Sequence, residues 1–530
     1  MYRSRPRSRC RSRCRGPSRA AAACVLVLAC LGAAPAQGPG PAPGPGSEPP
    51  APAIRWGKCP ERPVPAQMRC GTVKVPLDHA APGKGTVEIA LARIPATDRE
   101  KRLGSLLLNY GGPGSPGIAS LAADPDAFAD LGEHYDLVAF DPRGVGHSEP
   151  VSCGGSQQAE LEEGADAAAQ LAALRALARS CELASGPVLP YVGTVHVARD
   201  MDVIRRALGD EKLHYLGFSY GTRLGAVYAA QFPGSTGRMV LDGVDTLTEP
   251  LAEQALASAR GQQRALENFL SWCARRQDCV YGTNTRTARE KIDALVTRLD
   301  EEPLVGHDGS YVTGQDLVYG IGTALYSQLM WPALADVLAT VERGGDPAEL
   351  LQLGGPAVPS DDGEEESGPG TVPADNPQAA LLAVSCADDP DRSDVKAGAA
   401  AVEKELAALE EEFLKASKIF GPSQLATVLS CYGRPAGTDF IRRIDRPGAP
   451  RMLLVGTRGD PATPYEWTEE TAERLGSAVI VDYKGEGHTG YVSSPCVREY
   501  VDRFLLAGRL PSGTRSCPAE EVPPEAAGGG

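Results

Sequence analysis

The first half of the chain alternates short apolar runs with segments of helical periodicity. Val87 to Ile94 alternates apolar and polar side chains, which predicts a strand with one exposed face. Apolar runs predict buried strands at Ser105–Asn109, Leu137–Phe140 and Met239–Leu241, and helical patterns lie at 153–181 and 195–208. Strands that alternate with helices predict an α/β fold with a mostly parallel sheet covered by helices on both faces.

Long helical stretches replace this alternation from 249 to 443. Helices are predicted at Leu251–Arg275, Thr287–Leu299, Leu329–Val341 and Val402–Leu414, and the acidic segment 361–370 is expected to form an exposed loop. Strands resume at 452–456 and 478–481, followed by a helix at 496–506. We therefore expect a core in two parts, 54–248 and 444–518, a helical cap at 249–443 inserted before the late strands, and a tail at 519–530.

The N-terminal segment is typical of a targeting signal. Eight arginines lie between Arg3 and Arg19, an apolar run covers 20–34, and Ala34–Ala36 resembles a signal-peptidase site. We expect residues 1–36 to be a signal peptide and the Pro/Gly-rich residues 37–53 to be a linker. The apolar run is short for a transmembrane helix. An alternative is that Leu26–Cys30 is a lipobox, with Cys30 as a lipid-modified N-terminus that anchors the protein to the outer face of the membrane.

Charge and cysteine content narrow the function classes. The formal net charge is −15, and removal of the eight leader arginines leaves −23, which disfavours nucleic acid and anionic membrane surfaces as partners. Ten cysteines follow Cys30, and an even number behind a signal peptide predicts disulfides rather than a metal site. Pairing cysteines that are neighbours in order is the simplest of the possible connectivities. No cofactor is expected.

The candidate nucleophile is Ser219, in a Gly-x-Ser-x-Gly motif. The motif follows an apolar strand, Leu213–Phe218, and a helical pattern begins directly after it. A sharp turn from strand to helix would expose the Ser219 hydroxyl, and Gly217 and Gly221 would leave room for tight backbone packing. The N–H groups of the following helix would point at a developing oxyanion. The sequence therefore predicts a nucleophile elbow.

A serine nucleophile needs a base, and the base needs an orienting acid. Asp460 follows the strand at 452–456, and His488 lies in a Gly-rich turn after the strand at 478–481. The order Ser219, Asp460, His488 is that of α/β-hydrolase triads, and all three positions follow strands. Rival acids are Asp242, which ends an earlier strand, and Asp482. The other histidines considered, His147 and His214, are expected to shape a loop and to pack inside a strand, respectively.

The oxyanion hole needs two backbone N–H donors. Tyr220 directly follows the nucleophile, and the Gly-rich loop after the strand Ser105–Asn109 contains Gly112, the expected second donor. Gly112–Gly117 also matches G-x-G-x-x-G after a strand, so a dinucleotide site is an alternative. Pro113 and Pro116 remove N–H groups that a pyrophosphate would need, which disfavours that alternative.

Four motifs resemble those of secreted actinobacterial tripeptidyl aminopeptidases, relatives of the prolyl iminopeptidases of peptidase family S33. The motifs are Asn109–Gly114, Phe140–Ser148, Gly217–Thr222 and Asp460–Pro464, and the resemblance covers roughly 56 to 517. It implies an α/β-hydrolase core with a helical cap, and a Ser219–His488–Asp460 triad. This chain departs from the family where Tyr110 replaces a proline and where Ser115–Pro116 alters the end of the oxyanion loop.

The resemblance implies a secreted serine exopeptidase that releases short peptides from free N-termini through an acyl-enzyme. Such an enzyme needs an acid in the cap to pair with the substrate ammonium. Cys386–Asp389 resembles the family's Cys-x-Asp segment, so Asp388 or Asp389 is a candidate, although a solvated loop acid is equally compatible with the sequence. Rival functions are an esterase or lipase with the same triad, and a non-catalytic surface lipoprotein that kept the fold.

Overall fold

The structure is a computed structural model of the chain. The signal-peptide region, the lipobox with Cys30, and the acidic segment 361–370 lie outside the residues that it describes. The described residues are 52–60, 63–155, 167–354, 371–389, 399–434, 437–441, 444, 448–520 and 522.

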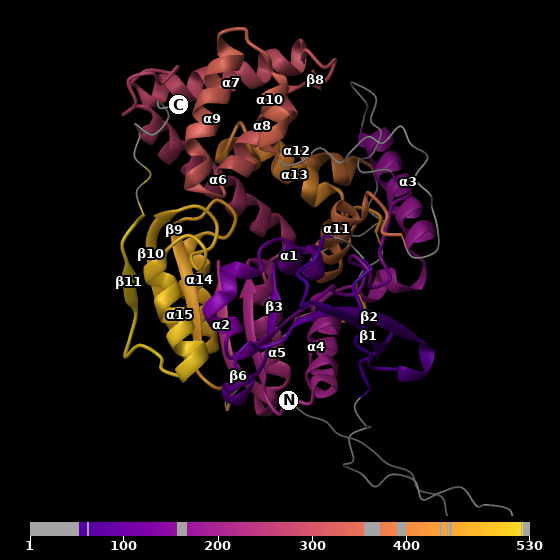
Figure 1. The fold of residues 1–530 in the computed structure, drawn as a ribbon. Helices are drawn as coiled ribbons and strands as arrows, with labels where there is room; N and C mark the ends of the chain where they lie inside the picture. Colours follow the sequence, from indigo (N-terminus) through magenta and orange to yellow (C-terminus); the bar gives the residue numbers. More distant parts are fainter. Residues whose placement is uncertain are drawn as a thin grey trace, which may run out of the picture. The chain divides into compact units, whose positions relative to one another are not determined.

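A nine-stranded sheet forms the centre of the described region (Figure 1), with strand order β1-β2-β4-β3-β5-β6-β9-β10-β11. Strand β2 pairs antiparallel with both β1 and β4, and every other neighbouring pair is parallel. The strands are β1 (Arg69–Pro76), β2 (Thr86–Ile94), β3 (Gly104–Asn109), β4 (Tyr135–Phe140), β5 (Leu213–Phe218), β6 (Thr236–Asp242), β9 (Met452–Gly459), β10 (Ala478–Glu486) and β11 (Arg515–Cys517). The predicted mostly parallel sheet is confirmed.

Both faces of the sheet are buried, which explains why its central strands read as continuous apolar runs. In β3, Leu107 packs into one apolar cluster, whereas Leu106 and Leu108 pack into the cluster on the opposite face. Helices α4 (Thr194–Leu208), α5 (Tyr220–Gln231) and α14 (Tyr465–Leu475) contribute to the first cluster. Helices α1 (Gly117–Ala123), α2 (Ala129–Gly132) and α15 (Pro495–Ala507) contribute to the second.

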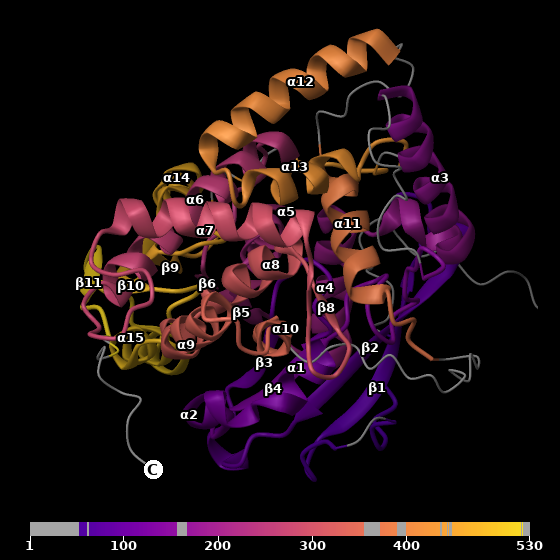
Figure 2. The same ribbon diagram turned by 90° about the horizontal axis from the view of Figure 1, so that it is seen from above.

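A helical insertion separates β6 from β9, as the change of pattern after residue 249 predicts. Figures 1 and 2 show its helices gathered at one end of the sheet. Its own apolar core contains Phe269, Trp272 and Trp331. The insertion comprises α6 (Leu251–Cys273), α7 (Thr285–Glu301), a hairpin of β7 (Leu304–Val305) and β8 (Tyr311–Val312), α8 (Gly314–Ala324), α9 (Trp331–Glu342), α10 (Ala348–Leu353), α11 (Asn376–Asp388), α12 (Ala399–Ala416) and α13 (Gly421–Leu429). A further helix, α3 (Ala167–Ser185), lies between β4 and α4.

In the part of the chain that the structure describes, five disulfides link ten cysteines, and each joins cysteines that are neighbours in order. The pairs are Cys59–Cys70, Cys153–Cys181, Cys273–Cys279, Cys386–Cys431 and Cys496–Cys517. This is the simplest connectivity that the sequence allows. The Cys386–Cys431 bridge ties α11 to the residues just after α13.

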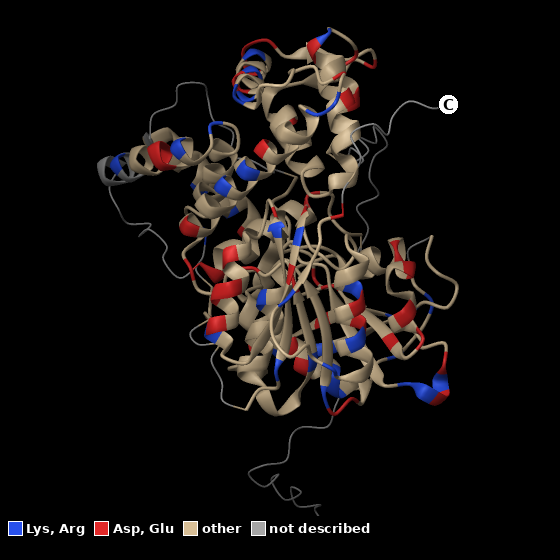
Figure 3. Ribbon diagram, turned by 90° about the vertical axis from the view of Figure 1, so that its left-hand side faces the viewer, with Lys and Arg blue, Asp and Glu red and all other residues tan. Residues whose placement is uncertain are grey.

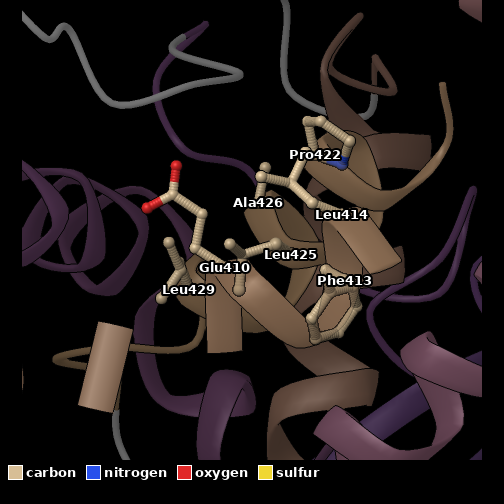
Figure 4. Close-up of a pocket in the computed structure, with 7 residues that line it drawn as sticks. All are labelled: Glu410, Phe413, Leu414, Pro422, Leu425, Ala426 and Leu429. Carbon is tan, nitrogen blue, oxygen red and sulfur yellow. The ribbon is translucent and has the colours of Figure 1, made fainter. Parts of the chain in front are cut away.

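Figure 3 shows Lys and Arg interspersed with Asp and Glu along the ribbon. A pocket of about 160 Å³ lies between α12 and α13 (Figure 4), lined by apolar side chains such as Phe413 and Leu425 and by none of the predicted site residues. Within the described ranges, none of the helices is both long enough and apolar enough to span a membrane.

Candidate active site

Ser219 lies at the turn between β5 and α5, in a backbone conformation that side-chain-bearing residues rarely adopt. Its φ is 54° and its ψ is −127°. Such strain costs on the order of 1–3 kcal/mol and is concentrated at functional sites. The flanking glycines permit the turn: a Cβ on Gly217 would lie 2.4 Å from the Tyr215 ring, and one on Gly221 would lie 2.6 Å from Asn109 Oδ1. The sequence therefore folds here into a tight elbow.

His488 and Asp460 are brought together by the loops that follow β10 and β9. His488 Nδ1 lies 2.9 Å from both carboxylate oxygens of Asp460. The backbone N–H groups of Ala462 and Thr463 donate to Asp460 Oδ1 at 2.9 and 2.8 Å, and the Thr463 hydroxyl donates to Oδ2 at 3.0 Å. The buried carboxylate is thus fixed in place, and it holds the imidazole by Nδ1 so that Nε2 is the nitrogen left for proton transfer.

The electrostatic surroundings of His488 favour the protonated form of its imidazole. Burial lowers the pKa of His488, but the adjacent charge and hydrogen bond of Asp460 outweigh it, so the pKa is raised above its usual value of 6.5. Asp242 and Asp245 add to the increase. An imidazolium formed during catalysis would therefore be stabilised.

Asp242, the rival acid, contacts the backbone of the loop that carries His488. Its Oδ1 and Oδ2 accept hydrogen bonds from the Gly490 and Tyr491 N–H groups at 2.8 and 2.7 Å. Its main-chain carbonyl accepts the Ser219 N–H at 2.9 Å. Burial raises the pKa of Asp242 to about 6. Asp242 therefore joins the elbow to the segment just after His488.

The other candidate acid, Asp482, and the histidines His214 and His147 interact with other residues. Asp482 pairs with Arg458 at 2.9 Å. His214 Nδ1 accepts the Arg238 N–H at 3.0 Å, and burial lowers its pKa to about 4, as suits a packing residue. His147 Nδ1 lies 3.5 Å from a carboxylate oxygen of Asp141 in the loop after β4.

The Gly-rich loop after β3 lies directly against the elbow. Gly111 and Gly112 have φ of 84° and 100°, and a Cβ on Gly111 would lie 2.8 Å from Ser219 Cβ. The Gly111 N–H donates to Asn109 Oδ1 at 3.1 Å. In the part of the chain that the structure describes, no group accepts the N–H of Gly112 or of Tyr220. Two donors are thus available where an oxyanion hole is expected.

Asp388 reaches the elbow, whereas Asp389 supports α6. The Thr194 N–H donates to Asp388 Oδ1 at 2.8 Å, and the Thr194 hydroxyl also contacts Asp388 and lies 2.6 Å from the Tyr220 hydroxyl. Asp389 Oδ1 instead accepts the Leu251 N–H at 3.2 Å, at the first residue of α6. Both carboxylates are buried.

Comparison with known proteins decides the family. Residues 104–307 match the family described as alpha/beta hydrolase fold, and residues 417–517 match the family described as TAP-like protein. Serine protease Hip1 of Mycobacterium tuberculosis H37Rv is 32% identical over 493 residues, covering 88% of this chain and 91% of that protein. The chain belongs to the TAP-like α/β-hydrolases. It is a serine hydrolase.

Other relatives of this TAP-like hydrolase carry different names. Tripeptidyl aminopeptidase of Streptomyces lividans is 32% identical over 494 residues, covering 89% of this chain and 87% of that protein. Carboxylesterase B of Mycobacterium tuberculosis H37Rv is 34% identical over 489 residues, covering 88% of this chain and 90% of that protein. The names include both peptidase and esterase activities.

Arg223 and Asp245 lie beside the candidate site of this TAP-like hydrolase, and sequence reasoning did not identify them. Arg223 lies between two carboxylates, 3.1 Å from Asp245 and 3.8 Å from Asp388. Arg223 lies one helical turn after Ser219, a spacing that hints at proximity but not at its partners. Within the described ranges, no cluster of three or more His, Cys, Asp or Glu side chains is arranged to hold a metal ion.

Proposed function

We propose that the protein is a serine exopeptidase that releases tripeptides from free N-termini. Ser219 attacks the scissile carbonyl while His488 takes its proton, and Asp460 stabilises the resulting imidazolium. The N–H groups of Gly112 and Tyr220 bind the oxyanion. His488 then donates its proton to the leaving nitrogen, and a water molecule, activated by the same imidazole, hydrolyses the acyl-enzyme.

One observation carries the catalytic part of the proposal. Ser219 has its strained φ of 54° in a chain whose late loops place His488 Nδ1 2.9 Å from Asp460. Asp242 connects the elbow with the loop of His488, since it accepts hydrogen bonds from the N–H groups of Ser219 and Gly490. This arrangement supports nucleophilic attack by the serine with a held, oriented base.

An excess of negative charge beside the elbow supports recognition of a free amino terminus. One guanidinium, that of Arg223, faces the two carboxylates of Asp245 and Asp388, so the group has a net charge of about −1 when all three are ionised. Burial raises the pKa of both carboxyl groups. A substrate ammonium would compensate the excess charge, and we assign Asp388 as its anchor, with Asp389 as the weaker candidate.

The experiment compares peptide amides that differ only at the amino terminus. A tripeptidyl p-nitroanilide with a free N-terminus should be cleaved, and its N-acetylated analogue should be cleaved at least about tenfold more slowly. Asp388→Asn should raise KM for the free substrate about 10- to 100-fold, while the matched Asp389→Asn should leave KM near the wild-type value. Equal cleavage of the free and acetylated substrates would contradict the exopeptidase assignment.

The second candidate function is a carboxylesterase with the same triad. The relative named Carboxylesterase B, at 34% identity, favours it. Turnover of simple acyl esters without any cleavage of tripeptidyl amides would support the esterase and exclude the peptidase.

We further propose that the enzyme works outside the cytoplasm. Five disulfides are suited to an oxidising compartment, and the arginine-rich leader supplies an export signal. Membrane attachment would come only through lipidation of Cys30. Mass spectrometry of the mature N-terminus distinguishes the two routes: a chain that begins near residue 37 is secreted, and a lipidated Cys30 is anchored.

A further inference from the structure

Tyr326 contacts the base from the insertion. It lies just after α8, and its main-chain carbonyl accepts the His488 N–H at 2.8 Å. Its ring meets the imidazole nearly edge to face, with ring centroids 5.0 Å apart and an interplanar angle of 71°. Residues 162 positions apart in sequence are therefore joined by both a backbone hydrogen bond and a ring contact.

The close approach depends on Gly487. Its φ is 99°, and a Cβ at this position would lie 2.8 Å from the Tyr326 carbonyl oxygen. A side chain there would push the base's loop away from the insertion. The glycine thus allows Tyr326 to lie directly beside the imidazole.

Tyr326 is partly exposed in spite of these contacts. The residue is 42% exposed, whereas the His488 side chain is 11% exposed. Tyr319 and Leu329, on the same stretch of chain, are 65% and 79% exposed. A partly exposed aromatic ring therefore adjoins the proposed catalytic base.

The chemistry of the base indicates which part of a substrate meets this surface. His488 must donate its proton to the leaving nitrogen, which therefore comes within about 2.6–3.2 Å of the imidazole. The first residue of the leaving product then lies beside the imidazole and beside the ring that packs on it. On the basis of the proposed acyl-enzyme mechanism, we propose that Tyr326 forms a wall of the leaving-group subsite and favours an aromatic or apolar side chain there.

Acyl transfer tests this subsite without requiring cleavage of a peptide bond. The acyl-enzyme is formed from a tripeptidyl ester, and phenylalaninamide or glycinamide is added to compete with water. The amine nitrogen attacks the acyl carbonyl carbon, and the bond between that carbon and Ser219 Oγ breaks. His488 transfers the amine proton to Ser219 Oγ. The ratio of transfer product to hydrolysed acid measures how well each amide occupies the subsite.

We expect wild-type enzyme to prefer phenylalaninamide over glycinamide about tenfold. Tyr326→Ala retains the main-chain carbonyl that holds His488, and it should bring this preference close to one. Tyr326→Phe should restore it. Tyr311→Ala, which removes a tyrosine that is 70% exposed on β8, is the matched control and should keep the wild-type preference.

The possible outcomes distinguish failure of the subsite proposal from failure of the tripeptidase proposal. A wild-type enzyme with no preference between the two amides would overturn the subsite whether or not the variants fold. An unchanged preference in Tyr326→Ala would also overturn it, as would equal weakening of both transfer reactions, which would indicate a purely structural role. Failure of the tripeptidase proposal would appear instead as no cleavage of tripeptidyl amides, and any ester that the enzyme turns over would then serve for the same acyl-transfer measurement.

Discussion

The main-chain carbonyl of Asp242 accepts the N–H of Ser219 at 2.9 Å, so the end of β6 directly supports the elbow. The carboxylate of the same residue holds the loop that follows His488. Through its main chain and its buried side chain, Asp242 therefore connects the elbow with the loop of His488, although 246 positions separate Asp242 from His488. The three candidate acids, Asp460, Asp242 and Asp482, therefore have different contacts, and mutation of each should have a different effect.

Replacing Asp460 should have the largest catalytic effect among those acids. In Asp460→Asn the imidazole would lose its charge partner and its correct tautomer, and kcat should fall about 10⁴-fold. Asp482→Asn breaks only a pair with half-exposed Arg458 and should change kcat less than twofold. A large loss in Asp482→Asn with none in Asp460→Asn would show that the acid has been assigned wrongly. Both values come from steady-state kinetics.

Asp242→Asn should mainly affect the position of the base's loop. An asparagine has one oxygen for the two N–H groups of Gly490 and Tyr491, so one of them would face the amide nitrogen. The free energy of unfolding should fall by about 1–3 kcal/mol, with a smaller loss of kcat than in Asp460→Asn. Chemical denaturation measures the first quantity. Stability equal to that of the wild type would contradict the linking role.

The spacing between the oxyanion loop and the elbow can be tested at Gly111. Gly111→Ala would place a Cβ 2.6 Å from the Phe218 carbonyl oxygen at a φ of 84°, so the loop must shift. Because the shift displaces the Gly112 N–H, kcat should fall about 10²- to 10³-fold. Gly234→Ala is the control, since a Cβ there meets nothing within 4 Å and kcat should be unchanged. Equal activity of the two variants would exclude this loop from the oxyanion hole.

The pH dependence should follow the titration of His488. The base must be neutral to act, and its pKa is raised above 6.5 because Asp460 outweighs the effect of burial. In wild-type enzyme, kcat/KM should therefore fall as the pH drops, with a midpoint above 6.5. Residual activity of Asp460→Asn should show this midpoint at lower pH, since the charge that raises it is gone. A midpoint that stays in place would assign the titration to another group.

The two disulfides of the insertion should contribute different amounts to the free energy of unfolding. Cys386–Cys431 closes 45 residues and should contribute about 4 kcal/mol, whereas Cys273–Cys279 closes 6 residues and should contribute about 2 kcal/mol. Paired Cys→Ala variants measured by denaturation test this order. Because α11 carries Asp388, loss of the first bridge should also raise KM for free peptides. The reverse order of stability losses would contradict the expectation.

Local signals in the sequence were sufficient for the elbow and for the fold class. The turn at Ser219 is encoded by adjacent residues, and the apolar runs of the central strands reflect burial on both faces. Strand β1 was not predicted because its burial pattern is irregular, and β11 has only three residues. Short or partly exposed strands give a weak periodic signal.

The links between distant residues could not be predicted. Arg223 forms an ion pair with Asp388, 165 positions later in the chain. The ring of Tyr326, which belongs to the insertion, packs on the imidazole of His488. Such contacts depend on how the insertion packs against the sheet, which no local pattern encodes. The sequence suggested Asp388 and Asp389 as equals, and the structure shows that only the first is linked to the elbow through Thr194.

Labelling with a fluorophosphonate tests the central claim most directly, because the probe reacts with an activated serine whatever the substrate. Wild-type protein and the control Ser235→Ala should each take up one equivalent of probe, while folded Ser219→Ala should take up none. Intact-protein mass spectrometry measures the uptake, and circular dichroism confirms folding. Folded wild-type protein that takes up no probe, or Ser219→Ala that is labelled to the same extent, would contradict the assignment of Ser219 as the nucleophile.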